Sequence, residues 1–118
     1  MHGLPKDFDG SVFVGKEVMQ VCFTVNQVSI HFEDAMGITA EGPLCHSLTM
    51  DDEGTTYEPP IRNGELQGLV GHAVTEATVI GPGDLRLRFD DGQSLIFCDD
   101  TPAYESYHIR LGDKEIHV

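Results

Sequence analysis

Apolar and polar residues alternate along two stretches of the chain, which is the pattern of a β-strand with one buried face and one exposed face. Residues 28–32 read Val-Ser-Ile-His-Phe, and residues 85–89 read Leu-Arg-Leu-Arg-Phe. Acidic turn residues follow each stretch, and the chain then continues with further apolar residues at 38–41 and 93–97. Because Asp and Gly favour tight turns, the pattern predicts two hairpins, each with one apolar face buried.

The two hairpins belong to an internal repeat that covers residues 14–42 and 70–98. The shared pattern is Val-Gly-x-x-Val-x-x-apolar, a gap, and then apolar-x-apolar-x-Phe-acid-Asp-small. The opening block of each copy is rich in Val and Thr, whose β-branched side chains favour strands. Each copy is therefore predicted to form a three-stranded antiparallel meander, and the two pseudo-symmetric meanders to form one barrel or sandwich. Phe32 and Phe89 should then occupy equivalent buried positions.

The segments outside the repeat predict less regular structure. Alternating apolar residues at 43–50 favour one more strand, whereas the stretch 51–68, rich in acids and with two adjacent prolines, is typical of a solvated linker. A Thr-Pro pair predicts at most one short helical turn near 102–106, and the alternation that follows predicts a C-terminal hairpin. Since no segment keeps a helical period, residues 1–118 are predicted to be a single, mostly β domain.

The charge balance narrows the class of partner. The chain has 20 acidic and 7 basic residues, so its formal net charge is -13. Nucleic acids and anionic membranes both require a basic face, so neither is expected as a partner. The N-terminus lacks the basic and then apolar pattern of a signal peptide, and Cys22, Cys45 and Cys98 are too few and too far apart for a disulfide framework. We therefore expect a cytoplasmic protein with reduced thiols.

No familiar catalytic pattern is present in the sequence. Histidines and cysteines do not have the spacing of zinc ligands, and the acidic run at 51–54 lacks the alternating ligand positions of an EF-hand. A Gly-x-Ser-x-Gly nucleophile elbow is also missing. The sequence therefore predicts no catalytic, cofactor-binding or metal-binding residue, and an enzymatic activity is not favoured.

Two segments combine residues that suit contact with a partner. One is the acid-rich linker, and the other is a Tyr-rich segment after the second copy, where each Tyr offers both apolar area and a hydroxyl. The candidate interaction residues are Asp51, Asp52, Glu53 and Glu58 in the linker, and Tyr104, Glu105, Tyr107 and His108 in the second segment.

The second copy carries motifs that point to a family. These are Gly71-x-x-Val74, Leu85-x-Leu87-x-Phe89-x-Asp91-Gly92 and Tyr104-Glu105-Ser106-Tyr107. With these motifs, residues 69–118 resemble an uncharacterised bacterial family of small, internally duplicated β-strand proteins. That family has no established activity, so the resemblance implies a β fold and no catalytic residue.

Three functions remain open on the sequence alone. The leading hypothesis is a non-enzymatic interaction module whose acidic surface binds a basic protein, as an immunity-protein-like inhibitor would. The second is a small-ligand-binding β-barrel, with or without hydrolytic activity. The third is a structural homo-oligomer, such as a homodimer formed by strand addition at a sheet edge.

Overall fold

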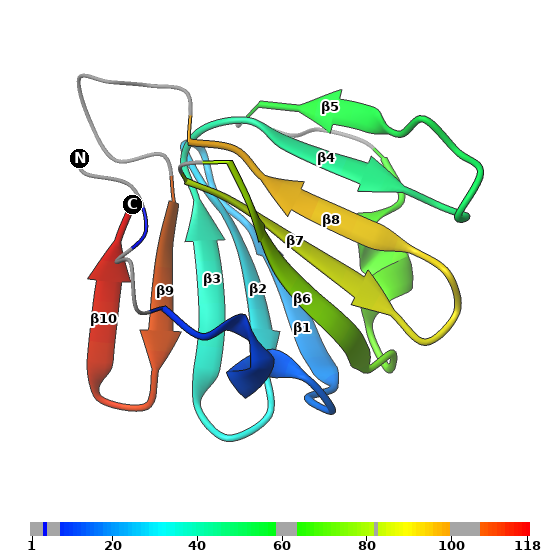
Figure 1. Ribbon diagram of the computed structural model, residues 1–118. Coiled ribbons are helices and arrows are strands. Elements are labelled where there is room, and N and C mark those ends of the chain that lie inside the picture. Colours follow the sequence, from blue (N-terminus) through cyan, green and yellow to red (C-terminus); the bar gives the residue numbers. More distant parts are fainter. Residues whose placement is uncertain (1–3, 5–7, 59–63, 82, 100–106) are drawn as a thin grey trace.

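Two five-stranded antiparallel sheets form the protein (Figure 1). The structure is a computed structural model that describes residues 4, 8–58, 64–81, 83–99 and 107–118. One sheet has the strand order β1-β2-β3-β9-β10 and the other β5-β4-β8-β7-β6. The strands are β1 (Val18–Phe23), β2 (Val28–Phe32), β3 (Met36–Ala40), β4 (Leu44–Ser47), β5 (Thr55–Tyr57), β6 (Val74–Ile80), β7 (Asp84–Phe89), β8 (Ser94–Phe97), β9 (Tyr107–Leu111) and β10 (Lys114–His117).

The two meanders and the C-terminal hairpin are present, and the strand order extends each meander to five strands. The hairpin β4–β5 follows β3 in the chain but pairs with β8, and the hairpin β9–β10 follows β8 but pairs with β3. Each half of the chain thus adds its last hairpin to the sheet of the other half. The described strands form two sheets that do not close into one ring of strands, so the architecture is a sandwich rather than a barrel.

The prediction of at most one helical turn is wrong, because the described residues contain the 3₁₀ helices η1 (Gly10–Phe13) and η2 (Leu66–Leu69). In the stretch 51–68, expected to be a linker, the described residues include β5 and the beginning of η2. One-turn helices leave no periodic pattern, and here they hold because Phe13 and Leu69 are fully buried. The predicted turn at 102–106 lies outside the described residues.

The two halves repeat the same backbone connections. The edge strands β1 and β6 meet through a bridge between Glu17 and Ala73. On either side of this bridge the halves exchange hydrogen bonds: Gly15 N–H to Val74 O (2.7 Å), Gly71 N–H to Val18 O (2.9 Å), Val18 N–H to His72 O (2.9 Å) and Val74 N–H to Lys16 O (3.0 Å). This two-fold correspondence is a property of the fold, whereas an origin by duplication stays a hypothesis.

The core between the sheets is apolar and continuous. Phe32 pairs with the residue at the start of β1 and Phe89 with the residue at the start of β6, and both rings are buried. This confirms the prediction for the two phenylalanines.

The three cysteines are half-buried and free of disulfides. None of the helices in the described ranges has the length and apolar character needed to cross a membrane.

Candidate functional site

Turns from both sheets follow one another around one end of the sandwich, from the β9–β10 turn at the left of Figure 1 to the β4–β5 loop at the right. They are the turns β2–β3, β4–β5, β7–β8 and β9–β10, together with the residue that precedes β1. These segments carry nine of the 20 acidic residues in the chain, and eight of the nine are exposed. We call this end the acidic rim, and its residues are Glu17, Glu33, Asp34, Asp51, Asp52, Glu53, Asp90, Asp91 and Asp113.

Backbone contacts connect these turns into one continuous surface. The β4–β5 loop lies beside the β7–β8 turn, because Ser47 at the end of β4 pairs with Ser94 at the start of β8. The turns are further joined by Asp90 N–H to Ala73 O (2.9 Å), Glu33 N–H to Glu17 O (3.1 Å) and Gly112 N–H to Ala35 O (3.1 Å). Each turn of the rim therefore contacts the next one, although the carboxylates are spread over the sequence.

In the first half, the rim is held by an ion pair between Lys16 and Asp34. The carboxylate of Glu33 accepts a hydrogen bond from the backbone N–H of Glu17 (2.9 Å). The hydrogen bond to Asp34, with the negative charge of that carboxylate, raises the pKa of Lys16 above its ordinary value. This corner of the rim therefore keeps the same charges throughout the neutral pH range.

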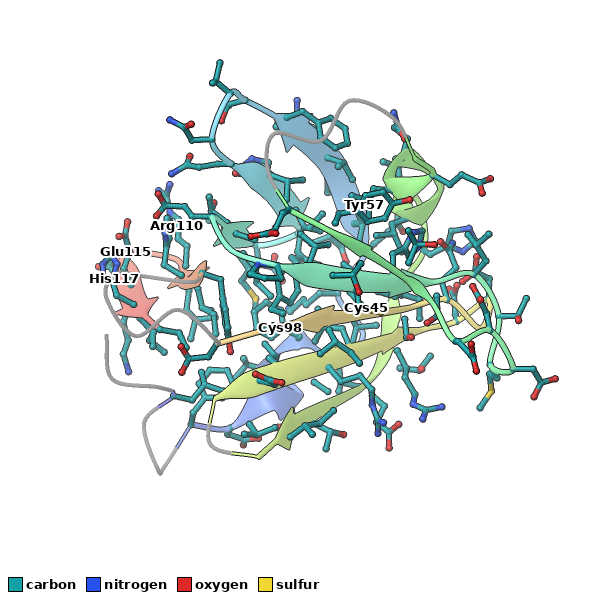
Figure 2. All side chains as sticks on the ribbon, turned by 90° about the horizontal axis from the view of Figure 1, so that it is seen from above. Cys45, Tyr57, Cys98, Arg110, Glu115 and His117 are labelled. Atoms are coloured by element: carbon teal, nitrogen blue, oxygen red, sulfur yellow. The ribbon has the colours of Figure 1, made fainter. Side chains whose placement is uncertain are left out.

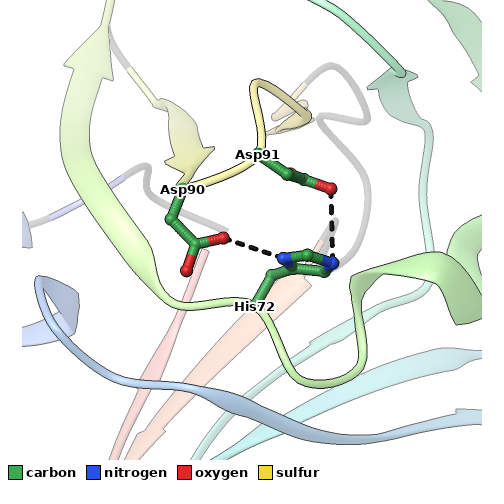
Figure 3. A group of neighbouring side chains, drawn as sticks. All are labelled: His72, Asp90 and Asp91. Carbon is green, nitrogen blue, oxygen red and sulfur yellow. Dashed lines mark hydrogen bonds and ion pairs between the residues drawn. The ribbon is translucent and has the colours of Figure 1, made fainter.

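In the second half, a histidine takes the place of the lysine (Figure 3). His72 Nδ1 lies 2.8 Å from Asp90 Oδ1, and His72 Nε2 lies 3.4 Å from Asp91 Oδ2. The other oxygen of Asp90 accepts the backbone N–H of Ala73 (3.2 Å). The hydrogen bond to Asp90 is the main cause that raises the pKa of His72, and the same bond lowers the pKa of Asp90. This corner therefore loses a positive charge as the pH rises through the raised pKa of His72.

A chain of polar side chains extends from this corner into the core. Gln93 Nε2 donates to Asp91 Oδ2 (2.7 Å) and to Gly68 O (3.1 Å). Gln93 Oε1 is then the acceptor, so the proton of the bond to His46 (2.7 Å) lies on His46 Nε2. The side chains of His46 and Gln93 are both buried. The second half thus links its rim carboxylates to a histidine inside the sandwich.

Among the described residues, one group has the geometry to bind a metal ion, and it consists of His72, Asp90 and Asp91. Each of these residues offers a ligand atom within 4.8 Å of the others. The imidazolium form of His72 places an N–H opposite each carboxylate, so the polar atoms are satisfied without an ion. We therefore assign no metal to them. The spacing rules could not find this group, because His72 is 18 residues from Asp90 and only the hairpin pairing brings them together.

The structure places the acidic residues that the sequence singled out in two locations. Asp51, Asp52 and Glu53 are exposed in the β4–β5 loop and belong to the acidic rim. The carboxylate of Asp52 also shapes this loop, because it accepts the backbone N–H groups of Leu48 (2.9 Å) and Gly54 (3.0 Å), and these bonds lower its pKa. Glu58 is exposed after β5, at the opposite end of that strand.

In the aromatic segment, Tyr107 does not lie on the surface that the sequence predicted. Tyr107 is buried against Phe97, and its hydroxyl donates to Gly83 O (2.6 Å). Burial raises the pKa of Tyr107, and the residue belongs to the core rather than to a binding surface. His108 lies on the outer face of β9, and Tyr104 and Glu105 lie outside the described residues.

The fold and its rim define a small, strongly acidic β-sandwich protein. The chain belongs to the family of unknown function DUF6188, which matches residues 10–118. This match confirms the expectation of an uncharacterised family. No curated protein and no solved structure matches the chain.

Proposed function

We propose that the protein is a non-enzymatic interaction module that binds a basic protein partner through the acidic rim. The observation that carries the proposal is the gathering of nine carboxylates from separate turns along one end of the fold. A surface of one sign attracts a partner of the opposite sign, accelerates their association and orients them before contact.

Part of the rim has no internal counterion. Lys16 and His72 pair with rim carboxylates in the two halves. For the exposed side chains of Asp51, Glu53 and Asp113, no hydrogen bond or ion pair is found within the residues that the structure describes. Carboxylates without internal partners are the ones that can pair with lysine and arginine of another protein at little structural cost.

The test compares two triple variants that remove the same charge. The rim variant is Asp51→Asn with Glu53→Gln and Asp113→Asn, and the control variant changes the acids outside the rim, Glu41→Gln with Glu58→Gln and Glu65→Gln. The probe is a lysine- and arginine-rich peptide, whose binding is measured by fluorescence anisotropy at several salt concentrations. We expect the rim variant to bind about tenfold more weakly and to show a smaller dependence on salt.

The control variant should bind the peptide nearly as well as the native protein, because only the local density of charge differs between the two variants. If both variants lose the same affinity, the peptide responds to net charge alone and the rim is not a binding surface. The same conclusion follows if the native protein fails to bind the peptide at low salt.

A further inference from the structure

A second surface of the molecule differs in chemistry from the acidic rim. It is the outer face of β2, β3, β9 and β10, where a hollow of about 300 Å³ opens near the β2–β3 turn. One row across these strands contains four residues in register, in the order His31, Gly37, Arg110 and Glu115. Because Gly37 has no side chain, the row is interrupted and its neighbours surround a depression.

Arg110 is held in place while its terminal nitrogens remain available. Its Nε donates to Gly112 O (3.1 Å), and no other hydrogen bond or ion pair of its guanidinium is found among the described residues. Glu115 stands opposite Arg110 on the neighbouring strand, and its carboxylate lies 3.4 Å from His117 Nε2 rather than on the arginine. Figure 2 shows Arg110, Glu115 and His117 together on the β9–β10 side of the molecule. The hollow thus presents a cation and an anion on adjacent strands.

His108 adds a hydrogen-bonding group to the same hollow. Its Nδ1 is buried and has no hydrogen-bond partner among the described residues. Leaving an N–H without a partner is more costly than leaving a weak acceptor, so the neutral ring favours the proton on Nε2. Because His108 and Arg110 are two residues apart on β9, this ring and the guanidinium lie on the same face of the sheet.

The net negative charge of the protein affects which small ligands can approach the hollow. A free anion that approached Arg110 would be repelled by the net charge of -13, and a free cation would find the acidic rim more attractive than Glu115. A small zwitterion has no net charge, so long-range repulsion does not oppose it. Its carboxylate can accept two hydrogen bonds from a guanidinium while its ammonium group faces a carboxylate.

We propose that this hollow binds a small zwitterion of the amino-acid type, with its carboxylate on Arg110 and its ammonium group on Glu115. His108 donates to the same carboxylate, and Gly37 provides the floor. The volume is at the lower end of small-molecule sites, which suits a ligand of this size. None of the residues that line the hollow belongs to the acidic rim, and the proposal does not depend on the function proposed for the rim.

The experiment follows backbone amide shifts of the full chain by NMR while the standard amino acids are added one at a time. Acetate, inorganic phosphate and methylammonium serve as probes that carry one charge type alone. We expect at least one amino acid to cause saturable shifts at Gly37, Thr39 and Arg110 below about 10 mM, with weaker effects from the single-charge probes. Arg110→Gln and Glu115→Gln should each weaken this binding about tenfold.

Matched controls separate the site from general charge effects. Lys114→Gln removes a cation from the same hairpin, and Glu58→Gln removes an exposed anion from the other sheet, so both should leave binding unchanged. Gly37→Ala should also weaken binding, because its methyl group fills the floor, 3.2 Å from Ile30 O and 3.6 Å from His31 Nδ1, and thermal unfolding of this variant checks that the tight contact with Ile30 O leaves the fold intact. The proposal is overturned if no amino acid causes saturable shifts, if acetate or phosphate binds as well as the best amino acid, or if either Arg110→Gln or Glu115→Gln has no effect.

Discussion

The two halves of the molecule share a scaffold and differ in the chemistry that it carries. Each half has a one-turn helix, a meander and a hairpin donated to the opposite sheet. At the rim, the first half has an ion pair between Lys16 and Asp34, whereas the second half has His72 between Asp90 and Asp91. The positions that fix the backbone are thus alike, and the divergence lies in polar side chains at the turns.

The difference continues into the core. His46 pairs with Leu95 in the strand register, and the corresponding pair of the other sheet is Ile109 with Ile38. Where the sheet of the second meander has the hydrogen-bonded His46 and Gln93, the sheet of the first meander has Ile109 and Met36, which are buried and apolar. A fold that is stable with an apolar pair on one side does not need a polar pair on the other. This polar chain is therefore a local specialisation of the second half.

The prediction with the largest expected effect on stability concerns the scaffold that the two halves share. Phe32→Ala and Phe89→Ala should each reduce the free energy of unfolding by about 3–5 kcal/mol, because both rings are buried. The loss for Phe32→Ala should be larger by about 0.5–1.5 kcal/mol, since its ring lies 5.3 Å from that of Phe13. Urea denaturation measures both values. Val25→Ala, at an exposed position, serves as the control and should stay within about 0.5 kcal/mol of the native protein. A small loss at either phenylalanine would show that the two halves do not share one core.

The sequence predicts the scaffold better than the rim. The alternation at 28–32 and 85–89 could be read directly, because a strand with one buried face imposes a period of two. The exchange of hairpins between the sheets could not be predicted. The alternation of apolar and polar residues in β4 and β9 is similar, and it does not show which sheet each strand joins. Tyr107 was placed on the surface because of its hydroxyl, although its alternation with Ile109 along β9 indicates the buried face. The His72 cluster was missed because its members meet only through the pairing of β6 with β7.

A second prediction concerns the buried polar pair. His46→Ile should lower the free energy of unfolding by about 1–3 kcal/mol, because it leaves Gln93 Oε1 buried without a donor. Adding Gln93→Met copies the apolar pair of the first half, and this double variant should regain most of the loss. A double-mutant cycle by urea denaturation measures the coupling. If the double variant is less stable than His46→Ile alone, the polar pair is required by the fold and is not a specialisation of the second half.

The smallest effect is the pH dependence of the two rim corners. The pKa of His72 is raised from its ordinary value of 6.5, so the folded protein holds this proton more tightly than the unfolded chain. The stability that results is complete below pH 6.5 and is lost as the pH rises through the raised value. The pKa of Asp90 is lowered from 3.8, so its contribution is present above pH 3.8 and is lost as the pH falls through the lowered value. The second-half corner therefore contributes fully between pH 3.8 and pH 6.5 and weakens as the pH rises through the raised pKa of His72.

The first-half corner should show no such change, because the pKa of Lys16 is raised from 10.5 and its charge persists above neutral pH. His72→Lys makes the second half resemble the first, so it should remove the fall in melting temperature that the native protein shows as the pH rises past 6.5. Lys16→His is the reciprocal change and should add a second such fall. NMR titration of the His72 ring gives its pKa directly. A value at or below 6.5 would mean that Asp90 and Asp91 do not stabilise the imidazolium, and the contrast between the corners would then have no electrostatic basis.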